Sequence, residues 1–141
     1  MVTTIKIAAA LIDDGAGRML LVRKAGTVAY MQAGGKIEPG ERAVDALCRE
    51  LEEELGWSIG AGVPVPLGRF TAQAANEPDC RVEAELFHLT ATTPLKAAAE
   101  IAEAIWVNAD QIRALPLAPL TRDEVVPLFE RRLTGRNETR G

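Results

Sequence analysis

Residues 41–55 have the apolar spacing of a helix, whereas most other apolar segments of the chain have the pattern of strands. This difference restricts the possible folds more than any other feature of the sequence. Apolar side chains recur within residues 41–55 at helical spacing and lie on one stripe. The stripe consists of Val44, Leu47, Cys48, Leu51 and Leu55. Gly56 follows where the pattern stops, as expected of a residue that readily adopts the left-handed conformation of a helix C-cap. The sequence therefore predicts one amphipathic helix that must cover an apolar surface.

The segments around this helix have the apolar runs and turn signals of strands. Predicted strands are 5–12, 19–22, 63–74, 81–91 and 104–107. Asp13-Asp14-Gly15 separates the first two, so residues 5–23 are predicted to form a hairpin. The glycine-rich stretch 24–40 is predicted to be mostly loop, and residues 122–133 form a second amphipathic helix. Strands on both sides of a central helix, with a helix near the end, indicate an α/β sandwich.

The length of 141 residues fits one compact domain. We assign this domain to residues 1–134 and treat residues 135–141 as a polar, frayed tail. The formal net charge of -4, from 16 basic and 20 acidic side chains, argues against a non-specific nucleic-acid binder. A small phosphorylated substrate remains compatible with this charge, because a bound divalent cation reverses the local sign.

Other bulk features point to the cytoplasm. No apolar run is long enough to span a bilayer, and the first residues lack the layout of a signal peptide. Cys48 and Cys80 are too few for a disulfide-stapled secreted domain. Cys48 lies on the apolar stripe and is expected to be a buried thiol.

Four glutamates, Glu50, Glu52, Glu53 and Glu54, crowd the last turns of the first helix. Glu50, Glu53 and Glu54 share one face, where each like-charge pair costs about 0.2–0.5 kcal/mol. Carboxylates at a helix C-terminus also oppose the helix dipole. A hard cation such as Mg²⁺ or Mn²⁺ removes both conflicts, since it prefers oxygen ligands. The alternative is an ordinary solvated acidic face, which is what most charge runs are.

The surroundings favour the metal interpretation. The chain reads Gly35-Lys36-Ile37-Glu38-Pro39-Gly40-Glu41, then seven residues, then Arg49-Glu50-Leu51-Glu52-Glu53-Glu54-Leu55-Gly56-Trp57. This stretch resembles the Nudix box, whose fixed glycine, glutamate and arginine positions are all matched at the right spacing. The strands before the box and the last strand and helix after it also resemble the family. The resemblance implies a Nudix-type α/β/α sandwich with a mixed β-sheet.

The resemblance also implies a function, the magnesium-dependent hydrolysis of a pyrophosphate bond. The substrate would be a nucleoside triphosphate or a nucleoside diphosphate linked to another group. By similarity, the metal ligands are Glu50, Glu53 and Glu54, with Gly35 alongside them. Glu53 and Glu50 are also expected to take part in catalysis, together with Arg49 and Glu41. The sequence does not identify which of the three glutamates, Glu50, Glu53 or Glu54, is the general base. Arg49, with Glu41 two turns before it, is expected to orient the catalytic glutamates.

Residues outside the helix complete the predicted site. A further metal carboxylate is expected shortly before the strand that contains Trp106, where Glu100 is favoured over Glu103. The expected substrate contacts are Arg23, Lys24, Gln32, Gly34 and Lys36. Gly34 and Gly35 allow the backbone to approach metal or phosphate closely. For His88, the single histidine, a structural role is expected, because it has no partner residues for a triad or a zinc site.

The chain departs from the family pattern at three places. Ala33 stands where proline usually precedes the glycine pair, and Trp57 stands where an aliphatic residue is more frequent. MutT-type enzymes that recognise oxidised guanine carry an asparagine before the last helix, where this chain has Ala118-Pro119-Leu120. That difference argues against the oxidised-guanine activity.

Two other functions compete with hydrolysis. A Nudix-fold sensor that binds a nucleotide without cleaving it usually has lost box glutamates, whereas this chain retains them. Such sensors also tend to carry an added DNA-binding domain, for which 141 residues leave no room. A Nudix isomerase needs a further cysteine and histidine for its chemistry, and by the family resemblance this chain lacks them. The expected partner is therefore a small nucleotide-like substrate, without nucleic acid or membrane, and a homodimer is compatible with the family.

Overall fold

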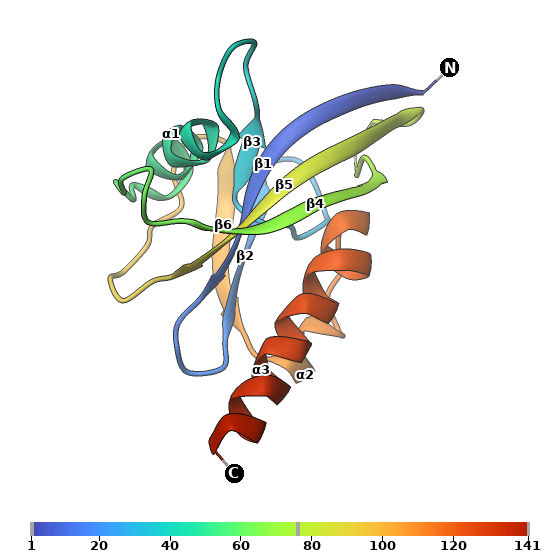
Figure 1. Cartoon of the computed structure of the whole chain (residues 1–141). Helices are drawn as coiled ribbons and strands as arrows, with labels where there is room; N and C mark the ends of the chain where they lie inside the picture. The colour runs from blue at the N-terminus through green and yellow to red at the C-terminus, as the bar shows by residue number, and fades with distance from the viewer. Residues whose placement is uncertain (1, 76, 141) are drawn as a thin grey trace.

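The computed structural model describes residues 2–75 and 77–140 (Figure 1). A mixed sheet at its centre has the strand order β4-β5-β1-β2-β6, with β3 paired to β1. The strands are β1 (Thr3–Asp13), β2 (Met19–Lys24), β3 (Gly34–Lys36), β4 (Val65–Gln73), β5 (Cys80–Thr90) and β6 (Ile101–Val107). The helices are α1 (Ala43–Leu55), the short α2 (Ala109–Ile112), the π-helix η1 (Thr121–Val125) and α3 (Val126–Arg140).

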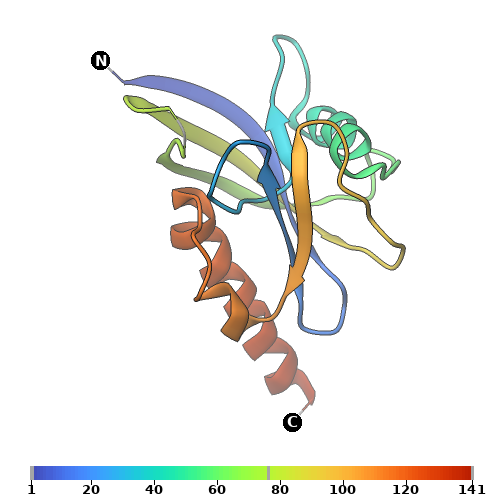
Figure 2. The same cartoon turned by 180° about the vertical axis from the view of Figure 1, so that it is seen from behind.

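The central strand β1 divides two apolar layers. Its residues Ala8, Ala10 and Ile12 pack on the face that α1 covers. Ala9 and Leu11 point to the opposite face, which η1 and α3 cover. Successive side chains of a strand alternate between faces, so a strand buried on both sides must be apolar throughout. Figures 1 and 2 show α1 and α3 on opposite sides of the sheet, which confirms the α/β/α sandwich and its mixed sheet.

The predicted hairpin is only partly correct. β1 and β2 are antiparallel neighbours, but their pairing is limited to Asp13 with Met19, beside the turn. Beyond this pair the two strands diverge, and residues 30–36 fill the gap between them. Met31 bridges to Val22 of β2, and β3 pairs with β1. The prediction that residues 24–40 are mostly loop missed β3, because a three-residue strand containing two glycines has no period to detect.

The helices differ from the prediction at their ends. α1 begins at Ala43 rather than residue 41, and Gly56 caps its C-terminus with a φ of 63°. Cys48 is half-buried rather than buried. α3 continues through Arg140, beyond residue 133 where the second helix was predicted to end. The sequence pattern also missed α2, which Asn108 opens with a capping box. No helix of the described residues has the length and apolar character that a membrane span requires.

Candidate active site

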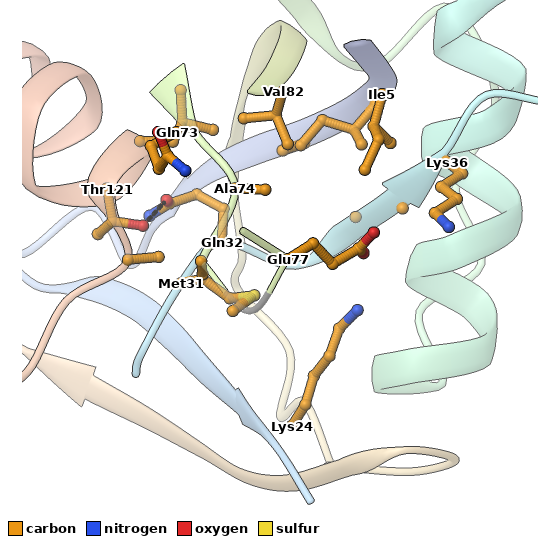
Figure 3. Close-up of a pocket in the computed structure, with 17 residues that line it drawn as sticks. Ile5, Lys24, Met31, Gln32, Lys36, Gln73, Ala74, Glu77, Val82 and Thr121 are labelled. Carbon is orange, nitrogen blue, oxygen red and sulfur yellow. Dashed lines mark hydrogen bonds between the residues drawn. The ribbon is translucent and has the colours of Figure 1, made fainter. Parts of the chain in front are cut away.

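A cavity of about 160 Å³ lies where β1 and β2 diverge (Figure 3). Its apolar wall comes from strands β1 and β5 through Ile5, Ile7 and Val82. Its polar lining comes from separate parts of the chain and includes Lys24, Gln32, Lys36, Glu77 and Thr121. Gly34 and Gly35 also line the cavity, and they connect it directly to α1, which packs beside β3. The site is therefore a partly apolar recess with cationic side chains at the side of the acidic helix.

Arg49 is the centre of an ion-pair network along α1. Its guanidinium donates to both carboxylate oxygens of Glu41, at 3.0 and 2.9 Å, and to Oε1 of Glu50 at 2.7 Å. It also donates to the carbonyl of Lys36 at 3.2 Å. The Arg49 guanidinium lowers the pKa of Glu41, and Glu41 in turn raises the pKa of Arg49. A planar fork with several donors can hold two carboxylates at once, which agrees with the predicted orienting role.

Glu54 is the most deeply buried carboxylate of the box, with only 2% of its surface exposed. Its Oε1 accepts a hydrogen bond of 3.0 Å from the backbone amide of Gly34. Burial raises the pKa of Glu54 to about 7 despite this hydrogen bond. Glu50 and Glu100 add to the rise, whereas Lys24 opposes it. A carboxylate buried in this way is costly to ionise unless a cation lies beside it.

The two glycines hold the loop against β1 and α1. A Cβ on Gly34 would lie 2.1 Å from the carbonyl oxygen of Ala8, and its φ of 148° is also unfavourable for other residues. A Cβ on Gly35 would lie 2.5 Å from Cδ of Glu50. Glycine is therefore required at position 34, where a Cβ would meet the backbone of β1, whereas at position 35 a Cβ would displace the side chain of a box carboxylate.

The carboxylates do not form a closed cluster. The described residues contain no group of three or more histidine, cysteine, aspartate or glutamate side chains already gathered as a metal site. Glu53 is exposed, while Glu50 is engaged with Arg49. The surroundings nevertheless suit a hard cation. The carboxylate of Glu54 makes one hydrogen bond among the described residues, and the charges that act on it are two carboxylates and one lysine.

Glu100 lies at the same end of the site. Its carboxylate is 3.7 Å from Nζ of Lys24, although 60% of its side chain is exposed. Glu103, the alternative, lies away from the cavity lining and accepts hydrogen bonds from Arg23 and the Tyr30 hydroxyl. Of these two carboxylates, Glu100 contributes to the raised pKa of Glu54, whereas Glu103 is engaged with Arg23 and Tyr30.

The predicted substrate residues fall into two groups. Lys24, Gln32, Gly34 and Lys36 all line the cavity. Arg23 does not line it, because its guanidinium pairs with Glu103 at 2.9 Å and donates to the carbonyl of Thr27. Its pairing with β6 was not visible in the sequence, since the two residues are far apart along the chain. A role of Arg23 toward substrate stays a prediction.

His88 lies elsewhere, on the α3 side of the sheet. Its Nε2 is hydrogen-bonded to the buried carboxylate of Asp13, and its Nδ1 lies 3.1 Å from the guanidinium of Arg132. Both contacts join separate elements of the fold, which agrees with a structural role.

The sequence pattern missed three polar residues that line the cavity, Gln73, Glu77 and Thr121. Thr121 is fully buried at the start of η1, where its hydroxyl donates to Oε1 of Gln32 at 2.7 Å. Glu77 reaches the cavity from the turn between β4 and β5, opposite Lys24 in Figure 3. A polar residue within a turn or helix start gives no signal of this kind. Only the tertiary arrangement brings residues 32, 77 and 121 together.

Comparison with known proteins agrees with this geometry. The model of the NUDIX domain matches residues 3–129 of the chain. The chain is 31% identical over 112 residues to the uncharacterized Nudix hydrolase YfcD of Escherichia coli K12, covering 74% of this chain and 59% of that protein. The chain thus spans less than two thirds of that relative. It is 30% identical over 133 residues to the CTP pyrophosphohydrolase of the same organism, covering 89% of each.

A solved structure, the MutT protein from Methanosarcina mazei Go1, superposes with a TM-score of 0.75. The sequence identity is 24%, and the match covers 93% of this chain and 96% of that chain. At this identity the likeness concerns the fold, and it agrees with the mixed sheet between two helical layers.

Proposed function

Because this chain belongs to the NUDIX domain family, we propose that it hydrolyses a pyrophosphate bond of a nucleoside triphosphate with the help of Mg²⁺ or Mn²⁺. The observation that carries the proposal is the connection between Glu54 and the cavity through Gly34. A buried carboxylate with a raised pKa thereby lies beside a recess that has lysines on its lining. Such an arrangement suits a cation and a phosphate chain bound next to each other.

Some residues of the box would bind the cation, and Arg49 would orient them. Glu50, Glu53 and Glu54 would hold the cation, with Glu100 as a further ligand from the loop before β6. The cation, when bound, would lower the pKa of a water molecule and offset charge on the phosphoryl oxygens. Arg49 would keep the carboxylate of Glu50 in position through the ion pair between them.

Two lysines would bind the phosphate chain. Lys24 and Lys36 both line the cavity, and each supplies a charged donor for phosphoryl oxygens. Lys24 lies at the end of β2 beside Glu100, and Lys36 ends β3, next to Gly35. The apolar wall of Ile5, Ile7 and Val82 would then receive the nucleoside, because flat bases bind favourably against aliphatic side chains.

A nucleoside triphosphate is favoured over larger substrates by one comparison. The relative that matches over 89% of both chains is named a CTP pyrophosphohydrolase.

The proposal is tested by measuring phosphate release with added pyrophosphatase. The panel contains nucleoside triphosphates, nucleotide sugars, ADP-ribose and dinucleoside polyphosphates, each with Mg²⁺ and again with excess EDTA. We expect turnover of nucleoside triphosphates that EDTA abolishes. A matched pair of variants, Glu53→Gln and Glu52→Gln, compares a predicted metal ligand with an adjacent exposed glutamate that is not one, and only the first should lose turnover. Nucleotide binding without turnover of any substrate would instead support the non-catalytic sensor.

A further inference from the structure

The side-chain amide of Gln32 has an unusual environment within the cavity lining. Only 6% of the residue is exposed, and its Oε1 accepts the Thr121 hydroxyl at 2.7 Å. The amide nitrogen has just one partner within the described structure, the sulfur of Met19 at 4.0 Å. A thioether is a weak acceptor, and an amide nitrogen carries two hydrogens. Gln32 thus keeps unused donor capacity in a buried position that lines the cavity.

The orientation of this amide follows from its neighbours. If oxygen and nitrogen were exchanged, the carbonyl oxygen would face the sulfur of Met19, which has no hydrogen to donate. In the observed orientation, Thr121 donates to the oxygen and Met19 accepts from the nitrogen, so both contacts are favourable. Thr121 is itself fully buried, so it cannot exchange this contact for water. In this orientation the Thr121 hydroxyl occupies the oxygen of Gln32, and the amide nitrogen is the group with donor capacity left for a ligand in the cavity.

Gln73 is the other amide of the cavity lining, and it lacks this restraint. It is exposed at the end of β4 and makes no side-chain hydrogen bond among the described residues. Its amide can turn to present either oxygen or nitrogen. Of the two amides in the lining, Gln32 is the one with a restrained orientation.

We propose that Gln32 selects nucleotides whose base carries a carbonyl oxygen on the edge away from the sugar, and that Thr121 is the positioning residue for this selection. The proposal rests on the proposed function, which places the phosphates at α1, Lys24 and Lys36. With the phosphates there, the base extends along the apolar wall toward Gln32 and Thr121 (Figure 3). Its distal edge carries oxygen in hypoxanthine, guanine and uracil, and an amino group in adenine and cytosine.

The selectivity arises from donor and acceptor pairing. A carbonyl oxygen accepts the available hydrogen of the Gln32 amide, whereas an amino group opposes one donor to another. Leaving a buried donor without an acceptor costs enough to weaken binding about tenfold or more. A small aliphatic recess without such a donor would discriminate far less between oxygen-bearing and amino-bearing bases, because the two kinds have nearly the same shape.

The inference is tested by calorimetric binding of nucleoside monophosphates, which need no hydrolysis. Inosine monophosphate is compared with adenosine monophosphate, and uridine monophosphate with cytidine monophosphate. We expect the oxygen-bearing member of each pair to bind about tenfold more tightly or better. The ratio of kcat/KM for ITP and ATP should move in the same direction. Equal affinity within both pairs, or preference for the amino bases, would overturn the inference.

Three variants assign the preference to the residues. Gln32→Met removes the donor at similar size and should bring the inosine-to-adenosine ratio close to one. Thr121→Val removes only the hydroxyl and should lower the same ratio, whereas Thr121→Ser should retain it. If Gln32→Met does not fold, the two Thr121 variants still decide the question. A ratio unchanged in Thr121→Val would contradict the positioning role, and a ratio unchanged in Gln32→Met would refute selection by Gln32.

The two proposals fail in different ways. A base preference in binding without turnover of any triphosphate would refute hydrolysis and leave the inference about Gln32 intact. Turnover of all triphosphates with no base preference would support hydrolysis and refute selection by Gln32.

Discussion

Replacing Glu54 by glutamine isolates the free-energy cost of burying a carboxylate in the box helix. Glutamine has nearly the same shape, and its oxygen can still accept the 3.0 Å hydrogen bond from Gly34. Burial raises the pKa of Glu54 from 4.5 to about 7. Between these two pH values the folded chain retains a proton that the unfolded chain has released. The free energy of unfolding therefore falls as the pH rises through this window.

The expected size follows from the shift. One pKa unit corresponds to about 1.4 kcal/mol, so the full cost of the ionised side chain is about 3 kcal/mol above the window. Glu54→Gln removes this cost. Without metal it should raise the free energy of unfolding by up to about 3 kcal/mol at about pH 8, and by less than about 1 kcal/mol at about pH 5.

The measurement is urea unfolding in EDTA at both pH values. Glu53→Gln is the matched control, since Glu53 is exposed on the same helix and its replacement should change stability by no more than about 0.5 kcal/mol. An equal gain at both pH values would refute titration of Glu54 as the cause. A loss of stability at about pH 8 would show that the carboxylate is stabilising without metal, contrary to the reasoning.

Three further results are expected. Gly35→Ala would place a Cβ 2.5 Å from Cδ of Glu50. Because the Glu50 side chain can move, the variant should still unfold cooperatively on heating, but its kcat should fall. A normal kcat would contradict the contact. Arg49→Lys replaces the fork that binds Glu41 and Glu50 by a single ammonium, so kcat should fall with little change in KM, whereas a change in KM alone would assign Arg49 to substrate binding. EDTA should abolish turnover and Mg²⁺ or Mn²⁺ should restore it, and turnover that survives exhaustive chelation would rule out the metal.

The elements with strong periodicity could be predicted from the sequence. The stripe of α1 and the alternating or continuous apolar runs of β1, β4 and β5 are local patterns, because the burial of each side chain follows from its own position along the element. The box spacing likewise placed Arg49 two turns from Glu41, and the structure has their guanidinium and carboxylate in contact. Both depend on positions within or directly before one helix, since Glu41 precedes Arg42, the N-cap of α1.

Properties that depend on other elements could not be predicted in this way. Glu54 belongs to a run of glutamates that looks uniform in the sequence, yet it is buried while Glu53 is exposed. The difference arises because β3 packs against one side of α1 and brings the Gly34 amide to Glu54. β3 itself is too short to have a periodic signal.

The sequence by itself determined the family, the box carboxylates and the alternation of strands and helices. These depend on residue type and on spacing within single elements. Only the tertiary structure decided which polar residues line the cavity. Gln32 and Thr121 meet there through a hydrogen bond, while Arg23 pairs with Glu103 outside the lining. The physical reason is that such contacts join segments far apart in the chain, and their distances are set by how the layers pack rather than by local pattern.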